Sequence, residues 1–234
     1  SDPSVIDRAA DFGINLFDTA RGYQNGNNER MVGAALKKVR PKVIISSKSM
    51  GRTKEALLKD LDTSLGALGT DYLDIWYLHN KNEPEAVTDD LLEAQRAAKQ
   101  SGKIRLAGVS THFNMDKMLA HLAELGQTDV VLTTYNFAMR PADAGQNTNP
   151  DAPKTDMTQA IRTARKAGLG IVVMKTMAGG TTRVQRGDRL YGANPAALSE
   201  RLSQEGVPVA AIKWALQNEA VDTAIVCMTD HDQF

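Results

Sequence analysis

The sequence predicts an α/β fold, a (β/α)8 TIM barrel, from three observations. Helical and strand-like segments alternate along the whole chain of 234 residues. Glycines end several helices just before the next strand, as in parallel strands joined by crossover helices. Polar residues stand at the carboxyl ends of successive strands, where barrel enzymes place their chemistry. A doubly wound open sheet is the alternative, and the lack of a Gly-x-Gly-x-x-Gly motif after the first strand disfavours it.

The predicted strands are short apolar runs bounded by turn residues. In chain order they span residues 14–17, 43–45, 72–78, 104–109, 129–133, 171–174 and 223–227, which makes seven. A closed barrel of this class has eight strands. We therefore expect the first strand to precede Ser1 and further chain to follow Phe234. The expected organisation is a single barrel domain over residues 1–234, incomplete at both ends, and a chain that cannot close its barrel is the alternative.

The predicted helices alternate with these strands and are delimited by capping residues. The clearest spans residues 53–68, where leucines recur on one face at helical spacing. Gly69 ends it, and Thr88 and Asn114 are expected to cap the next two helices. The longest connection, 139–154, is of a length that is usually functional in a compact domain. The full set of predicted helices is 5–11, 29–39, 53–68, 88–100, 114–125, 156–168, 195–204 and 208–218.

Composition and charge are those of a soluble globular protein. Apolar residues make up 42% and charged residues 24%, and the 28 basic side chains equal the 28 acidic ones in number. No net field therefore favours nucleic acid or an anionic membrane as a partner. No apolar run reaches membrane-spanning length, so we expect a cytoplasmic protein, with export left open because Ser1 is not a methionine. The lone Cys227 excludes an intrachain disulfide, and its apolar neighbours predict a buried side chain.

Three successive predicted strands end in residues that carry chemistry. The first ends in Asp18, the second in Lys48 and the third in His79, and Tyr23 stands in the loop after the first. Since the carboxyl ends of neighbouring parallel strands lie at one edge of the sheet, these four side chains are expected to meet. A charge at the end of a buried strand is costly unless it is paired, which favours an ion pair between Asp18 and Lys48.

This set of side chains suits the reduction of a carbonyl group. An ammonium beside a phenol stabilises the deprotonated phenol, so Tyr23 could give a proton to a developing alkoxide. Asp18 would hold Lys48, and His79 would orient or polarise the carbonyl oxygen. Hydride must come from a cofactor, because no side chain supplies it. Taken singly, the four residues also fit structural roles, such as an ion pair at the barrel mouth or a tyrosine packed on its rim.

Several motifs resemble those of the aldo-keto reductase family and follow its order. They are FDTARGY followed by Glu29, SSK, LDIWYLH, GKIRLAGVS, VVLTTYN, GLGIVVMK and DTAIVCMTD. The resemblance covers nearly the whole chain and implies a (β/α)8 barrel that binds NADPH or NADH in extended form across its carboxyl face. It also implies that Asp18, Tyr23, Lys48 and His79 form the catalytic tetrad, with Tyr23 as general acid. MKTMAGG is similar to a bacterial branch that often carries an additional iron–sulfur segment, which this sequence lacks.

The positions that the family uses for the cofactor match in part. Ser110 matches, but Thr111 replaces the usual Asn, Leu132 the usual Gln, and Lys175 the aromatic residue that stacks on the nicotinamide. Glycines could let backbone amides approach the pyrophosphate. The usual Arg or Lys for a 2′-phosphate is not evident after the last strand, so NADP(H) is a family expectation and NAD(H) stays open. The cofactor-binding candidates are Ser110, Thr111, Lys175, Thr176, Gly179, Gly180 and Met228, and no metal site is expected.

The predicted activity is the reduction of an aldehyde or ketone to an alcohol by hydride transfer from NAD(P)H. The rival is a nicotinamide-nucleotide-binding barrel that acts as a redox sensor or regulatory subunit with little turnover. The altered carboxamide contacts favour this rival, and the intact tetrad opposes it. The expected partner of the enzyme is a small carbonyl molecule. The sequence indicates neither the identity of that substrate nor the oligomeric state.

Overall fold

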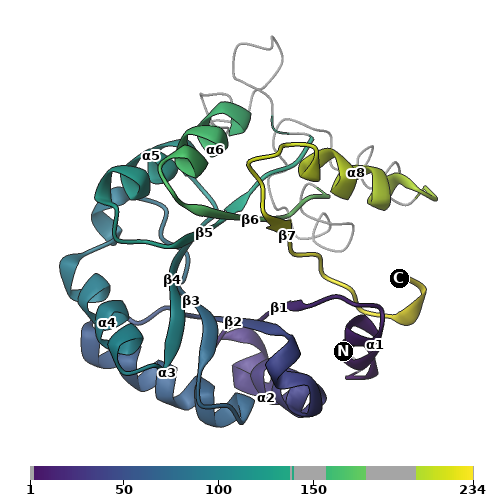
Figure 1. Cartoon of the computed structure of the whole chain (residues 1–234), viewed down its shortest axis with the longest axis horizontal. Coiled ribbons are helices and arrows are strands. Elements are labelled where there is room, and N and C mark those ends of the chain that lie inside the picture. Colours follow the sequence, from purple (N-terminus) through teal and green to yellow (C-terminus); the bar gives the residue numbers. More distant parts are fainter. Residues whose placement is uncertain (1–2, 138, 140–156, 178–203, 234) are drawn as a thin grey trace. The chain divides into compact units, whose positions relative to one another are not determined.

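The computed structural model describes residues 3–137, 139, 157–177 and 204–233. The chain divides into two compact units, each of which is described by itself. The first comprises Ser1–Lys81, Glu85–Ser110 and Cys227–Phe234, and the second comprises Asn82–Pro84 and Thr111–Val226. Helices and strands alternate in both units (Figure 1), which confirms the predicted alternation.

The first unit is built on parallel strands that pair in chain order. These strands are β1 Leu16–Asp18, β2 Ile44–Ser49, β3 Leu73–Leu78 and β4 Ile104–Thr111, of which the last residue, Thr111, is assigned to the second unit. The α-helices of this unit are α1 Ser4–Asp11, α2 Asn27–Leu36, α3 Lys54–Leu68 and α4 Asp89–Gln100. In Figure 1, α2, α3 and α4 lie along one face of the strands. Short 3-10 helices are η1 Tyr23–Gly26, η2 Lys37–Lys42, η3 Pro84–Ala86, which follows β3 in the chain, and η5 His231–Gln233.

The second unit repeats the parallel arrangement. Its described strands are β5 Val130–Thr134, β6 Gly170–Met174 and β7 Thr223–Ala224, and β6 pairs in parallel with both neighbours. Its described α-helices are α5 Met115–Leu125, α6 Met157–Lys166 and α8 Val207–Leu216. The last strand is shorter than the predicted 223–227, and the predicted stretches 139–154 and 195–204 lie almost entirely outside the described residues.

Helix α3 shows how the sequence sets the limits and packing of an element. Thr53 Oγ1 accepts a hydrogen bond from the Ala56 amide at 3.2 Å, which satisfies one of the unpaired donors of the first turn. Gly69 ends the helix with φ of 63°, a left-handed conformation that favours glycine. Leu57 and Leu61 on the predicted apolar face have no exposed surface. The predicted helix is confirmed at both ends.

The strand register decides which side chains share a face. Asp18 is in register with Ser46, and Lys48 with Tyr77. Alternate residues of a strand point to the same side of the sheet, so Ser46 and Lys48 share a face of β2. Trp76, whose parity differs from that of His79, is completely buried.

Two expected capping residues stand at the N-cap positions but make no side-chain capping bond, and the expected burial of Cys227 is wrong. Thr88 stands before α4 without a side-chain capping bond. Asn114 stands before α5 in a left-handed conformation, with φ of 48°, and its side-chain oxygen accepts no capping bond, while its side-chain amide donates to the Asn82 carbonyl at 3.2 Å and to Glu83. Cys227 is exposed, not buried.

Candidate active site

Lys48 lies at the centre of the candidate site, in β2 of the first unit. Its side chain is 2% exposed, and its ammonium pairs with the carboxylate of Asp18. It also donates to the Thr19 carbonyl at 2.7 Å. The other Asp18 oxygen accepts a hydrogen bond from Ser46 Oγ at 2.6 Å. A buried ammonium is tolerable only with such partners, so Asp18 and the Thr19 carbonyl fix the position of the charge.

Tyr23 opens η1, directly after the loop that follows β1. Its ring centroid lies 5.1 Å from Lys48 Nζ, within the range of a cation–π contact. The same ring meets the imidazole of His79 edge to face, with centroids 6.0 Å apart and an angle of 79° between the rings. Tyr23 is 42% exposed. The Tyr23 ring therefore contacts the buried Lys48 ammonium and the His79 imidazole, and part of it is exposed to solvent.

His79 directly follows β3, and its backbone amide donates to the Ser49 carbonyl at 2.8 Å. Burial lowers the pKa of this imidazole to about 4, with the nearby Lys48 ammonium adding to the effect and the Asp18 carboxylate opposing it in part. Its Nδ1 is buried and has no hydrogen-bond partner among the described residues. At neutral pH the ring is therefore uncharged, and one ring nitrogen carries a hydrogen that it can donate.

A second phenol, Tyr77, lies beside the same ion pair but differs in character. It is in register with Lys48 and 1% exposed. Burial, helped by the Asp18 carboxylate, raises the pKa of Tyr77 well above its ordinary value. Tyr77 therefore stays protonated at any physiological pH, and Tyr23 is the more accessible phenol of the two.

The four residues that the sequence singled out lie in one unit, linked by the contacts given above. The predicted pairing of Asp18 with Lys48 is present. Sequence reasoning missed Ser46, which donates to Asp18. A signal existed, because Ser46 precedes Lys48 by two residues and must share its face of the strand. The catalytic roles of the four stay predictions.

Among the predicted cofactor residues, Ser110 and Met228 belong to the first unit. Ser110 is fully buried, and its Oγ accepts the Asn80 amide at 2.9 Å. Its own hydroxyl hydrogen is donated to no described residue, so Ser110 retains a donor. Met228 is partly exposed. Both assignments stay predictions.

In the second unit, the predicted cofactor residues are Thr111, Lys175 and Thr176. Thr111 Oγ1 donates to the Phe113 carbonyl at 2.9 Å, which leaves its oxygen as an acceptor. Lys175 directly follows β6 with φ of 56°, a left-handed conformation that is uncommon outside glycine and often found at functional sites. Thr176 is 2% exposed. Gly179 and Gly180 lie outside the described residues.

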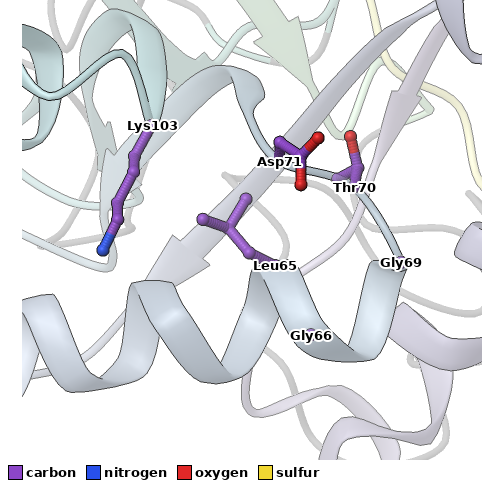
Figure 2. A pocket seen from close by; sticks show the side chains of 6 residues that line it. All are labelled: Leu65, Gly66, Gly69, Thr70, Asp71 and Lys103. Atoms are coloured by element: carbon purple, nitrogen blue, oxygen red, sulfur yellow. The ribbon is translucent and has the colours of Figure 1, made fainter.

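A hollow of about 400 Å³ lies elsewhere in the first unit, at the C-terminal end of α3 (Figure 2). Asp71, on its wall, precedes β3, whereas His79 follows the other end of that strand. The Lys103 ammonium on its rim already pairs with Asp62 at 2.5 Å. The hollow is therefore separate from the candidate site, and none of Asp18, Tyr23, Lys48 and His79 lines it. Within the described ranges, no three His, Cys, Asp or Glu side chains gather to hold a metal ion, and no helix is long and apolar enough to cross a membrane.

Comparison with known proteins assigns the chain to a family. The sequence profile of the Aldo/keto reductase family matches residues 3–234. The chain belongs to this family. Aldo-keto reductases among the solved structures share its fold. One from Bacillus halodurans in its holo form has a TM-score of 0.73 at 23% identity, with 100% of this chain and 79% of that chain covered. These matches confirm the predicted fold class.

Three of the curated relatives match shorter stretches of this chain. The uncharacterized oxidoreductase YqkF of Bacillus subtilis is 33% identical over 46% of this chain and 39% of its own length. The NADH-specific methylglyoxal reductase of Escherichia coli is 30% identical over 55% of this chain and 46% of its own. A putative voltage-gated potassium channel subunit beta of Schizosaccharomyces pombe is 28% identical over 61% of this chain and 43% of its own length. The chain thus spans less than half the length of these three relatives.

Proposed function

We propose that this aldo-keto reductase family member reduces an aldehyde or ketone to an alcohol with a nicotinamide cofactor, using Tyr23 as general acid. The observation that carries the proposal is the position of the Tyr23 ring, 5.1 Å from the buried ammonium of Lys48 and edge-on to His79. Each of the four side chains suits one part of a carbonyl reduction. The family and the names of its relatives support the same class of reaction.

In the proposed mechanism the carbonyl oxygen lies between Tyr23 and His79. The reduced nicotinamide, when bound, supplies the hydride that forms the new bond at the carbonyl carbon. Tyr23 donates its phenolic proton to the oxygen as negative charge develops there. The Lys48 ammonium stabilises the phenolate that remains, and Asp18 holds the ammonium in place. His79 is neutral because burial and Lys48 lower its pKa to about 4, so it donates a hydrogen bond and leaves proton transfer to Tyr23.

We propose that seven residues hold the cofactor, and three of the described ones, Ser110, Thr111 and Lys175, have polar groups that suit it. Ser110 has a buried hydroxyl hydrogen that no described residue accepts, which suits the oxygen of a carboxamide. Thr111 offers an acceptor in its own unit, which suits an amide hydrogen. Lys175 contributes a positive charge toward phosphate. The proposed set is Ser110, Thr111, Lys175, Thr176, Gly179, Gly180 and Met228.

Replacing Tyr23 by Phe tests the role of the acid. The variant keeps the aromatic ring and loses only the proton donor, so we expect turnover of small aldehydes to fall by about a hundredfold or more, with nearly unchanged cofactor affinity. The measurement is steady-state oxidation of NADPH and NADH, with the dissociation constants taken from fluorescence quenching. Tyr72→Phe is the matched control, because Tyr72 lies between Arg40 and Arg105 in the same unit, before β3. Equal turnover in the Tyr23 variant and the wild type rejects the assignment.

A second candidate is a nucleotide-binding barrel that works as a redox sensor or regulatory subunit. The replacements at Thr111 and Leu132 favour it, and so does the similarity to a protein named as a putative channel subunit. A panel of small aldehydes separates the two functions. An enzyme oxidises the cofactor at steady state with some member of the panel, whereas a sensor binds the cofactor at similar affinity without turnover.

A further inference from the structure

The loop that carries Tyr23 is held in an unfavourable backbone conformation. Gln24, Asn25 and Gly26 have φ values of 51°, 54° and 81°, which puts three successive residues in the left-handed region. Only glycine adopts this region without cost. Tyr23 itself is 42% exposed, so burial of its ring does not hold the loop. Such conformations persist only where surrounding contacts enforce them.

Those contacts come from a buried carboxylate at the start of α2. Glu29 is completely buried, and its Oε1 accepts a hydrogen bond from Ser47 Oγ at 2.7 Å. Its Oε2 lies 2.5 Å from Nη1 of Arg21, whose side chain is 19% exposed, in an ion pair that does not have the geometry of a hydrogen bond. A buried carboxylate without a partner is strongly destabilising. Glu29 therefore draws the Arg21 side chain inward from the loop.

The left-handed turn makes room for that ion pair. A Cβ at Gly26 would lie 1.4 Å from Nη2 of Arg21, so the guanidinium occupies the place that any other side chain would take. Arg21 is also tied through its backbone, whose amide donates to the Lys48 carbonyl at 3.0 Å. The Tyr23 amide donates to the Ala20 carbonyl at 3.0 Å and closes the turn around Arg21.

These contacts join the phenol to the strand that carries the ammonium. Ser47 and Lys48 are adjacent in β2, so the chain of contacts runs from β2 through Glu29 to Arg21 and from Arg21 back to β2. Tyr23 lies two residues beyond Arg21. We propose that Arg21 and Glu29 are positioning residues, which fix the Tyr23 phenol against Lys48 without touching the substrate. This inference rests on the role proposed for Tyr23.

Glu29→Gln tests the inference because it keeps the shape of the side chain and removes its charge. A shift of about 1 Å in a catalytic group can cost a hundredfold in rate, so we expect kcat to fall at least tenfold with little change in the KM for NADPH. The matched control is Asp74→Asn, which weakens the pairs of the buried Asp74 carboxylate with Arg40 and with the exposed Arg105 in the same unit. The control should lower the melting temperature and leave kcat within about twofold.

A double-mutant cycle shows whether Glu29 acts through Tyr23. In the Tyr23→Phe background the phenol is gone, so Glu29→Gln should lower the residual kcat by less than twofold. A further tenfold loss there overturns the inference, and so does an unchanged kcat in the single variant. If Glu29→Gln does not fold, Ser47→Ala removes one hydrogen bond to Glu29 and is carried through the same cycle with the same criteria. If Tyr23→Phe alone retains wild-type turnover, the proposed function fails first, and this outcome is distinct from the other two.

Discussion

His79 keeps a neutral imidazole at physiological pH because its surroundings disfavour the charged ring. Burial and the Lys48 ammonium lower its pKa to about 4, whereas an unfolded chain has a histidine pKa of about 6.5. Between these values the unfolded chain binds a proton that the folded chain does not. The free energy of unfolding therefore falls as the pH falls from 6.5 towards 4, and this contribution is constant above 6.5.

The free energy of unfolding of the wild type should depend on pH more steeply than that of His79→Gln, whose side chain does not titrate. We expect the wild type to lose on the order of 1–2 kcal/mol more stability than the variant between pH 7 and pH 5. Urea denaturation at the two pH values gives the free energies of unfolding. Equal losses in the two proteins would show that the imidazole is not shielded as described.

At the level of single residues, sequence reasoning found the charges and missed what depends on packing. Asp18, Lys48 and His79 could be predicted to gather because each ends a parallel strand. The buried pair of Glu29 with Arg21 could not, because Asn25 and Gly26 indicate a turn but not that the Arg21 side chain packs against it. The exposure of Cys227 was equally hidden, since a run of apolar neighbours indicates burial only where the strand continues, and β7 ends at Ala224.

Among the elements, the packing of α2 on α3 depends on a glycine. A Cβ at Gly33 would lie 2.2 Å from the Leu68 carbonyl oxygen, which is backbone and cannot turn aside. Gly33→Ala should therefore push the helices apart and destabilise the chain by about 1–3 kcal/mol, the usual cost of overpacking. Gly66→Ala is the matched control, because nothing lies within 4 Å of its Cβ position in α3.

The control variant Gly66→Ala is itself expected to change the free energy of unfolding, in the opposite direction. Alanine is favoured over glycine in a helix by about 0.8–1.0 kcal/mol, so Gly66→Ala should stabilise the chain. Urea denaturation of both variants measures the difference. The interpretation of α2 and α3 is wrong if the two substitutions change stability in the same direction by similar amounts.

The elements and their C-terminal glycines were largely predictable, and the side-chain capping bonds at their N-termini were not. Apolar spacing and glycine positions located α3 and α5, because these signals are local. Thr53 and Thr88 look alike in sequence, yet only Thr53 makes a capping bond. Asn114 gives its amide to Asn82 and Glu83, which lie far away in the chain. Whether the side chain at an N-cap position makes a capping bond depends on tertiary contacts, and a local sequence pattern does not contain these.

For the whole molecule, the proposed cofactor provides a test that does not require turnover. A ligand that binds only the folded chain at a hundred times its dissociation constant stabilises that chain by about 2.7 kcal/mol. For a protein of 150–250 residues this corresponds to a rise in melting temperature of roughly 5–10 °C. Tyr23→Phe should show the same rise, since the phenol acts on the carbonyl and not on cofactor binding.

The same titration compares NADPH with NADH. Met228, Thr229 and Asp230 after β7 provide no positive charge for a 2′-phosphate, so we expect the two dissociation constants to differ by less than tenfold, or about 1.4 kcal/mol. Both cofactors should then raise the melting temperature by similar amounts at equal concentration. A rise with NADPH alone would require a phosphate contact elsewhere, and Lys175→Met would test the first candidate. No rise with either cofactor would remove the hydride source, and with it the reduction proposed for the site around Tyr23.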